Sequence, residues 1–104
     1  MLFRSGGPGP AVQVVPNDSV VTATILSVAP SPAPFLWQAE LRLSDSQDVS
    51  GYVNLTKDKV GQNLVVKTKE DMAAYKPGDE VGGNLRVAGD ERGSLLFFLN
   101  ISRK

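Results

Sequence analysis

Alternating apolar and polar positions recur along the chain, and the pattern is clearest between Phe35 and Leu43. The odd-numbered positions of this segment are all apolar, whereas positions 38, 40 and 42 are polar. A period of two residues is typical of a β-strand with one buried face. We therefore expect Trp37 to face a hydrophobic core, and Gln38 and Arg42 to lie on the solvent-exposed face.

Other segments of strand character are separated by turns rich in Gly, Pro and Asp. They cover residues 20–28, 49–55, 80–87 and 94–101, and a shorter apolar stretch covers 64–68. We expect a turn at 45–48 and place Tyr52 on the outer face of the strand that follows it. The sequence Thr68-Lys69-Glu70-Asp71 has the spacing of a capping box and predicts a short helix through Tyr75. Many short strands with at most one short helix indicate an all-β barrel or sandwich.

The last predicted strand, 94–101, is apolar on both faces. Its odd-numbered residues, including Phe97, have the phase that we expect of core residues, while Leu96 and Phe98 occupy the opposite face. A strand that is apolar on both sides is usually covered on both sides. We therefore predict Leu96 and Phe98 as candidate interaction residues, covered by the N-terminal segment, the short helix or a partner chain.

The N-terminal segment differs in composition from the rest of the chain. It contains the run Gly6-Gly7-Pro8-Gly9-Pro10, which neither buries apolar surface nor supports a regular ladder. We expect residues 1–17 to form a flexible Gly/Pro-rich leader and residues 18–104 to form a single domain. The sequence has no apolar run of the roughly 20 residues that a membrane span needs and no signal-peptide pattern. We therefore expect a cytoplasmic protein with no membrane partner.

Two residue types with wide chemical use are missing, because the sequence contains no His and no Cys. Their absence excludes a disulfide framework, a thiol nucleophile, a His-based triad and a zinc site with sulfur or imidazole ligands. The acidic pairs of the chain fall in turns, where local hydrogen bonding explains Asp. No glycine-rich phosphate loop follows a predicted strand. We therefore expect a non-catalytic protein with no metal and no cofactor.

The charges of the chain balance, with 11 Lys+Arg against 11 Asp+Glu. A net charge of zero gives no general attraction to nucleic acid. Locally, however, basic residues are in excess between positions 57 and 69, where four lysines accompany one acidic residue, Asp58. The balance of charge therefore limits the affinity for a polyanion without excluding one.

Three stretches resemble the OB-fold family of small β-barrels. Residues 35–45 look like the family's second strand and the Asp-containing turn after it, residues 76–81 are similar to the entry into its fourth strand, and residues 93–101 resemble its closing strand. The resemblance implies an all-β, five- to six-stranded OB-like β-barrel, although the stretch 64–68 departs from the simplest five-strand plan. It also implies that single-stranded nucleic acid or an oligosaccharide binds on the face of strands two and three.

Binding of a single strand requires aromatic rings for stacking and cations along the backbone path. The candidate nucleic-acid-binding residues are Gln38, Arg42, Tyr52, Lys57, Lys59, Lys67, Lys69 and Arg86. Structural roles compete with this interpretation, because an outward Tyr often packs across strands and lysines often protect a sheet edge. We predict a monomeric or homodimeric module that binds single-stranded nucleic acid weakly. The alternative is a protein-interaction or assembly domain that uses the leader and the closing strand.

Overall fold

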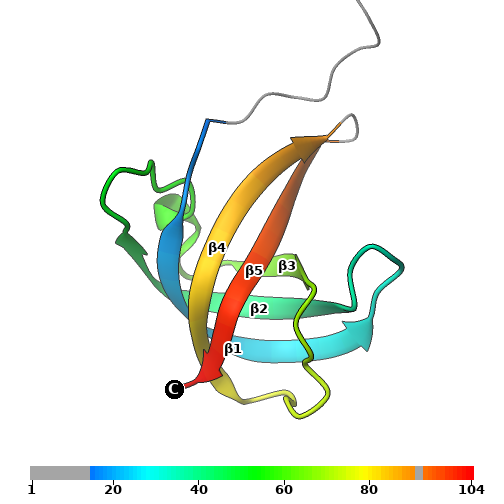
Figure 1. Cartoon of the computed structure of the whole chain (residues 1–104). Helices are drawn as coiled ribbons and strands as arrows, with labels where there is room; N and C mark the ends of the chain where they lie inside the picture. Colours follow the sequence, from blue (N-terminus) through cyan, green and yellow to red (C-terminus); the bar gives the residue numbers. More distant parts are fainter. Residues whose placement is uncertain (1–14, 91–92) are drawn as a thin grey trace, which may run out of the picture.

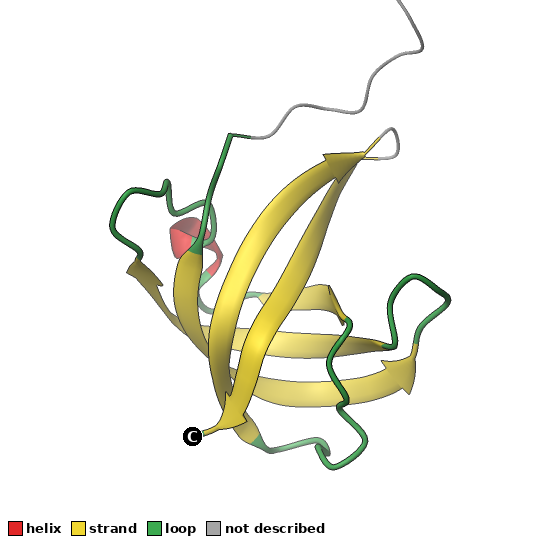
Figure 2. Ribbon diagram, viewed as in Figure 1, coloured by secondary structure: helices red, strands yellow, loops and turns green. Residues whose placement is uncertain are grey.

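The computed structural model describes residues 15–90 and 93–104, and within these ranges the chain is all-β, as the sequence predicts. This part of the chain forms five strands and one short 3-10 helix, which are drawn in Figures 1 and 2. The elements are β1 (Ser19–Pro30), β2 (Trp37–Asp48), η2 (Lys57–Lys59), β3 (Asn63–Thr68), β4 (Glu80–Asp90) and β5 (Gly93–Arg103). Among the described residues, no helix is long and apolar enough to cross a membrane.

The five strands close into a barrel in the order β1-β2-β3-β5-β4. β1 pairs antiparallel with β2 along one edge and with β4 along the other, which completes the ring. Figure 1 shows β4 and β5 as a long curved hairpin that crosses β1 and β2 at a steep angle. β3 runs parallel to β5 and meets it at one residue pair, Lys67 and Phe97. The barrel wall is therefore least continuous between β3 and β5.

The core lies inside this ring and is built from alternate positions of the strands. Its fully or almost fully buried residues are Val21, Ala23, Ile25, Ala39, Leu41, Leu43, Leu64, Val66, Met72, Val81, Leu85 and Phe98. The alternation predicted for residues 37–43 is confirmed, because the odd-numbered side chains face inward and Trp37 packs, half-buried, against the core. The hydrophobic effect acting on a period of two thus explains the inner face of β2.

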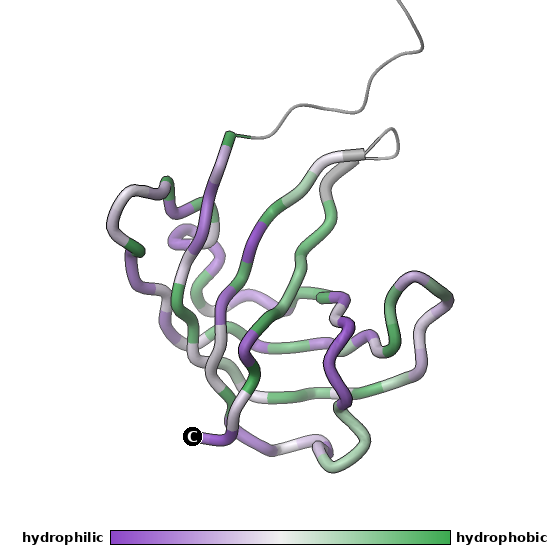
Figure 3. The backbone as a smooth tube through the Cα atoms, in the orientation of Figure 1, coloured by the Kyte–Doolittle hydropathy of each residue, from purple (hydrophilic) through white to green (hydrophobic). Residues whose placement is uncertain are grey.

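The two faces of β5 are the reverse of the expected arrangement. Phe98 is completely buried, Leu96 is half-buried against the core, and Phe97 lies on the outer face. The prediction that Leu96 and Phe98 face a covering partner is therefore wrong. Phe98 lies directly opposite Leu85, which faces the core, and pairing partners point to the same side of a sheet. Figure 3 shows the middle of β5 as hydrophobic, so its own sequence leaves the inward face undetermined.

A bulge near the end of β5 reverses its alternation. The register with β4 shifts between Gly82 and Asn84, so that Gly83 lies opposite two residues of β5. One of these, Asn100, has a φ of 54°, in the left-handed region that Asn tolerates better than most residues. A Cβ at position 83 would lie 2.5 Å from the carbonyl oxygen of Leu99, so this close approach requires glycine.

The segment after β2 is a long loop with η2, whereas the sequence predicts a turn at 45–48 and a strand at 49–55. Both predictions are wrong: β2 continues through Asp48, and the third strand is the short stretch 63–68. The buried hydroxyl of Thr56 explains how the loop is held, because its oxygen lies 2.8 Å from Ser19 Oγ and 2.9 Å from Ser46 Oγ. These side-chain hydrogen bonds, together with an isolated bridge between Asn17 and Val53, fix this loop to the barrel.

The short helix predicted through Tyr75 is also wrong. The hydroxyl of Thr68 accepts a hydrogen bond from the Glu70 N–H at 3.0 Å, and Asp71 Oδ1 accepts one from the Ala73 N–H at 2.8 Å. These side chains therefore form local turns at the positions where the capping box predicts a helix start.

Two side chains of this segment hold it against the barrel in place of a helix. Met72 is fully buried in the core. The Glu70 carboxylate accepts hydrogen bonds from the backbone N–H groups of Asn100 and Ile101, at the bulge of β5. The connection from β3 to β4 is thus held to the barrel by one buried apolar side chain, Met72, and by the hydrogen bonds of one carboxylate, Glu70.

The described part of the predicted leader begins at Val15, and residues 1–14 lie outside the described residues. Asn17 is already buried: its Nδ2 donates to the Val87 carbonyl and its Oδ1 accepts from the Val87 N–H, each at 2.8 Å. The side-chain amide thereby extends the β4 ladder beyond the start of β1. The folded body therefore includes Asn17, one residue earlier than the predicted boundary at 18.

Candidate functional site

A row of four side chains crosses the outer face of the barrel. Gln38 of β2 lies opposite Lys67 of β3, Lys67 lies opposite Phe97 of β5, and Phe97 lies opposite Arg86 of β4. Directly opposed residues point to the same face of a sheet. The register therefore places three predicted site residues, Gln38, Lys67 and Arg86, in one row with Phe97 on the outer face of the barrel.

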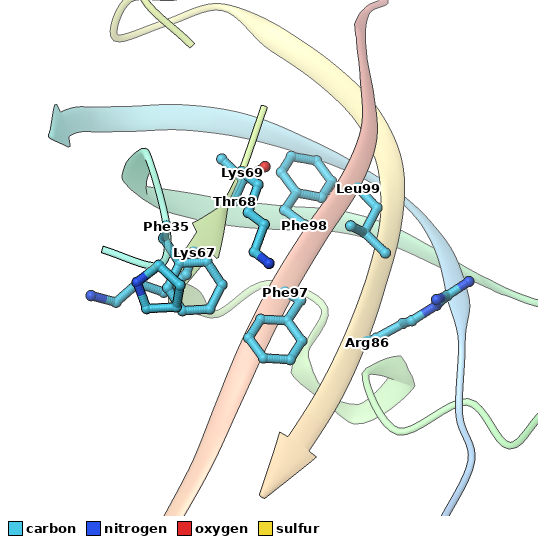
Figure 4. Close-up of a pocket in the computed structure, with 9 residues that line it drawn as sticks. Phe35, Lys67, Thr68, Lys69, Arg86, Phe97, Phe98 and Leu99 are labelled. Atoms are coloured by element: carbon cyan, nitrogen blue, oxygen red, sulfur yellow. The ribbon is translucent and has the colours of Figure 1, made fainter. Parts of the chain in front are cut away.

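A groove lies where β3 and β5 separate, next to the connection between β1 and β2. Its volume is about 460 Å³, and it is lined by Pro34, Phe35, Lys67, Thr68, Lys69, Arg86, Phe97, Phe98 and Leu99. The Phe35 and Phe97 rings form a tilted pair, with centroids 5.3 Å apart and planes at 35° (Figure 4). This separation is within the usual range for paired aromatic rings. Both rings are only half-buried, so they present a flat apolar surface to the groove.

The proline-rich connection explains how Phe35 reaches Phe97 across the sheet. Residues 31–36 leave β1 and return to β2, and the Leu36 N–H donates to the Thr68 carbonyl at 3.0 Å. The Ser31 N–H donates to the Leu36 carbonyl at 3.1 Å, which closes the loop on itself. The loop is therefore attached to the end of β3, and Phe35 is held beside the groove.

Two lysines stand beside the aromatic pair. Lys67 projects from the outer face of β3, and its Nζ lies 3.3 Å from Ser31 Oγ. Lys69 follows β3 and is exposed. Within the described residues, no carboxylate lines the groove and neither lysine makes an ion pair. The groove thus combines an apolar aromatic surface with two cations at its rim.

The third cation of the groove, Arg86, is arranged differently. Its Nη2 lies 3.4 Å from Asp18 Oδ2, and the Asp18 side chain is almost completely buried. Asn84 donates a second hydrogen bond to this carboxylate, from Nδ2 to Oδ1 at 3.1 Å. The charge of Arg86 is therefore balanced by a carboxylate on the barrel wall.

Arg42 lies outside the groove. It is exposed on the same face of β2 as Gln38, but four residues further along the strand, or about 13 Å. Glu40 stands between the two. Arg42 is therefore placed to contact only a ligand that extends from the groove along β2.

Tyr52, Lys57 and Lys59 lie at the opposite end of β2, in the loop that carries η2. Tyr52 is 49% exposed and stands alone, without a second ring beside it among the described aromatic pairs. Lys57 Nζ lies 3.3 Å from Asp48 Oδ1. The hydrogen bond from Asn54, and then the hydrogen bond and charge of Lys57, lower the pKa of Asp48 below its ordinary value. The structure therefore divides the predicted site residues between two ends of the barrel.

Phe35 and Phe97 are the groove residues that the sequence interpretation missed, because both have the phase of core residues. One signal pointed to Phe97: a strand with two apolar faces must expose or cover one of them. For Phe35 the signal was its position directly after three prolines, since Pro34 cannot continue a central ladder. The start of β2 at Trp37 leaves Phe35 in the loop.

Comparisons of this chain with protein-family models, with curated proteins and with solved structures find no match. The residues that line the groove therefore indicate which kind of ligand fits it. Half-buried aromatic rings bind planar groups by stacking, and adjacent lysines bind anions. A ligand that carries both a planar ring and a negative charge fits this combination.

Proposed function

We propose that this protein is a non-catalytic, OB-type β-barrel that binds single-stranded nucleic acid in the groove between β3 and β5. The observation that carries the proposal is the half-buried Phe35–Phe97 pair with Lys67 and Lys69 beside it. Nucleotides are the most abundant ligands that join a planar ring to a phosphate at close spacing. The five-stranded closed order supports the OB-type assignment, together with the resemblance in the sequence.

The groove favours a single strand over a duplex. Stacking on Phe35 or Phe97 requires the exposed face of a base, and in a duplex both faces are already stacked within the helix. Each such stack contributes about 1–3 kcal/mol and depends little on the identity of the base. We therefore expect a preference for unpaired bases with weak sequence selectivity.

The cations of the groove predict weak, salt-dependent binding. If Lys67 and Lys69 each neutralise one phosphate, the logarithm of the association constant falls with the logarithm of salt concentration with a slope of about −1.4. This slope is small compared with that of proteins that contact many phosphates. It agrees with the net charge of zero, which provides no long-range attraction.

Titration of the protein into a fluorescently labelled, mixed-sequence oligonucleotide tests the proposal. Anisotropy should show saturable binding to DNA or RNA single strands at low salt, with weaker binding to the corresponding duplex. Phe97→Leu keeps an apolar side chain at this position and removes the ring, so it should weaken binding about 5- to 150-fold. Absence of saturable binding at low salt, or equal binding by the Phe97→Leu variant, would contradict the proposal.

The alternative, a protein-interaction domain that uses the leader and the closing strand, has less support. Phe98 is completely buried within the chain, and Leu96 packs against the core. Residues 1–14 of the leader lie outside the described residues. Light scattering that gives a monomer mass at high protein concentration would count further against this alternative. The cytoplasmic location stays a prediction from the sequence.

A further inference from the structure

Arg86 borders the groove, but its charged group is directed elsewhere. Its position opposite Phe97 places it on the outer face of the β4–β5 hairpin. Figure 4 shows its side chain extending away from Phe35, Phe97 and Lys67. The guanidinium instead meets Asp18, with Nη2 and Oδ2 at 3.4 Å. The stem of Arg86 therefore lines the groove while its charge is held at the side of β4 that faces the start of β1.

The carboxylate that holds Arg86 is itself fixed in place. Asp18 is only 5% exposed, and its backbone N–H donates to the Val53 carbonyl at 3.1 Å. The side chain of Asn84 donates to Asp18 Oδ1, and the side chain of Asn100 donates to Asn84 Oδ1, each at 3.1 Å. Asp18 thus belongs to a hydrogen-bonded chain across the β4–β5 hairpin. Arg86, by contrast, is half-exposed and can change rotamer.

Asp18 has a direct electrostatic effect on the groove. A buried carboxylate cannot be left unpaired without a large cost, so it retains the nearest cation. A phosphate in the groove must compete with Asp18 for Arg86. An ion pair that is already neutral releases no counterion when a phosphate approaches, so it adds nothing to the salt dependence of binding.

We infer that Asp18 withholds Arg86 from the groove and thereby lowers the affinity for a polyanionic ligand. The inference rests on the proposed function, because it concerns the same groove. It assigns Asp18 a role that goes beyond the stability of the barrel. It also explains why only two of the three cations near the groove are counted toward phosphate binding.

Neutralising Asp18 should convert Arg86 into a third phosphate contact. Asp18→Asn keeps an oxygen acceptor for Asn84 and removes the negative charge. The salt slope should become steeper by about 0.7, the contribution of one phosphate in a single strand. The gain in affinity should therefore be about 2.5-fold larger at 50 mM than at 200 mM salt, which is the slope change applied to a fourfold dilution.

Oligonucleotide titrations of four proteins test this inference: wild type, Asp18→Asn, Asp18→Asn combined with Arg86→Gln, and Asp48→Asn. The first substitution should raise affinity at low salt and steepen the slope. The double variant should return to the wild-type slope, because the released cation is gone. Asp48→Asn is the matched control: it removes one carboxylate from an ion pair at the other end of the barrel and should leave the slope unchanged.

The outcomes separate the inference from the function that it rests on. If wild type binds but Asp18→Asn binds equally or more weakly, the inference is overturned and the proposed function stands. If the steeper slope persists in the double variant, Arg86 is not its source and the inference is again overturned. If no protein in the set binds saturably, both proposals fall.

Folding must be checked for each variant, because Asp18 is buried. Circular dichroism and the denaturant midpoint identify any variant that has lost the barrel. Asp18→Ser provides a second neutral substitution, since its hydroxyl still accepts a hydrogen bond from Asn84. Arg86 is the same in both neutral variants, so either one that folds decides the question.

Discussion

The two ends of β2 carry the same kinds of side chain in different arrangements. At the end near Trp37, two aromatic rings and two lysines surround a groove. At the other end, beyond Asp48, one exposed tyrosine and two lysines occupy a loop. At the first end the two rings are in contact, and within the described residues neither lysine pairs with a carboxylate, whereas Lys57 at the other end pairs with Asp48. Similar residue types therefore do not give equal binding potential.

The two ends differ because one is built from a single continuous segment and the other from segments that are far apart in the sequence. The loop end collects residues 52–59 from one continuous segment, so its lysines are accompanied by the polar groups that hold the loop. The groove end joins Phe35, Lys67 and Phe97 from three separate segments. Strand pairing fixes the positions of two of these residues without using their side chains. Those side chains are therefore available for a ligand.

Removing aromatic rings at each end is the strongest test of this comparison. Combined replacement of Phe35 and Phe97 by leucine should abolish measurable oligonucleotide binding, because each lost stack costs about 1–3 kcal/mol. Tyr52→Leu removes a ring of similar size from the loop end and should leave the affinity within about twofold of wild type. Fluorescence anisotropy at low salt measures both variants.

The opposite result would show that the binding site lies at the loop end. If Tyr52→Leu weakens binding as much as the double leucine variant does, the ligand contacts the η2 loop and the groove is not the site. Denaturant unfolding of both variants is the necessary control, because Phe97 and Phe35 are half-buried.

Stability provides the next test, because the loop end depends on a buried polar network. Thr56→Val has nearly the same shape but leaves the hydroxyls of Ser19 and Ser46 without this partner. Ser19 Oγ keeps its hydrogen bond to the Leu85 carbonyl, and Ser46 Oγ keeps its bonds to the Asn54 side chain. Two hydrogen bonds are lost, at about 0.5–1.5 kcal/mol each, so the free energy of unfolding should fall by about 1–3 kcal/mol. Urea unfolding measures this loss, and Ser44→Ala, which removes an exposed hydroxyl bond to the Thr22 carbonyl, is the milder control.

The same variant shows whether the two ends are independent. Thr56 belongs to the loop end and does not line the groove. Oligonucleotide affinity of folded Thr56→Val should therefore equal that of wild type. A parallel loss of affinity would mean that the loop end supports the groove and that the two ends cannot be considered separately.

The parts of the fold that could be predicted from the sequence are those with a regular period. Ala39, Leu41 and Leu43 are buried as their alternation requires, and β1 and β4 occur where β-branched and alternating residues predict them. The loop 49–55 also alternates, yet it forms no strand, because Thr56 and Asn54 find side-chain partners on the barrel. Alternation alone therefore does not establish a strand.

The basic residues of the candidate site could be predicted from the sequence, but its aromatic residues could not. Lys67, Lys69 and Arg86 follow from the expected lysine excess and from the outer face of β4. Phe97 could not be assigned, because β5 is apolar on both sides and only its register with Leu85 selects Phe98 for the core. The bulge at Asn100 is equally hidden, since nothing in the local sequence requires it. The register of β5 with β4 determines both which face of β5 is buried and where the bulge lies.

Charge removal at the two ends should have a smaller effect than ring removal, but one of clear sign. Lys67→Gln with Lys69→Gln should make the salt slope shallower by about 1.4 and weaken binding at low salt. Lys57→Gln with Lys59→Gln removes the same charge from the loop end and should leave the slope unchanged. Titration at several salt concentrations distinguishes the pairs, and equal changes in both would show that only net charge matters.

The smallest expected effect concerns the ion pair at the loop end and appears only as the pH changes. The hydrogen bond from Asn54 and the neighbouring Lys57 lower the pKa of Asp48 below 3.8 in the folded chain. The carboxylate form is therefore favoured by folding, and its stabilising contribution is present above 3.8 and is lost as the pH falls through the folded pKa. Wild type should be slightly more stable than Asp48→Asn at about pH 6, and the difference should disappear once the pH has fallen below the folded pKa. Urea unfolding at low ionic strength measures it, because salt screens an exposed pair.

A difference that persists at the lowest pH would show that Asp48 acts through the shape of its hydrogen bond to Asn54 and not through its charge. The same variant should bind an oligonucleotide as wild type does, because its charge lies at the end of the barrel that the ligand does not reach.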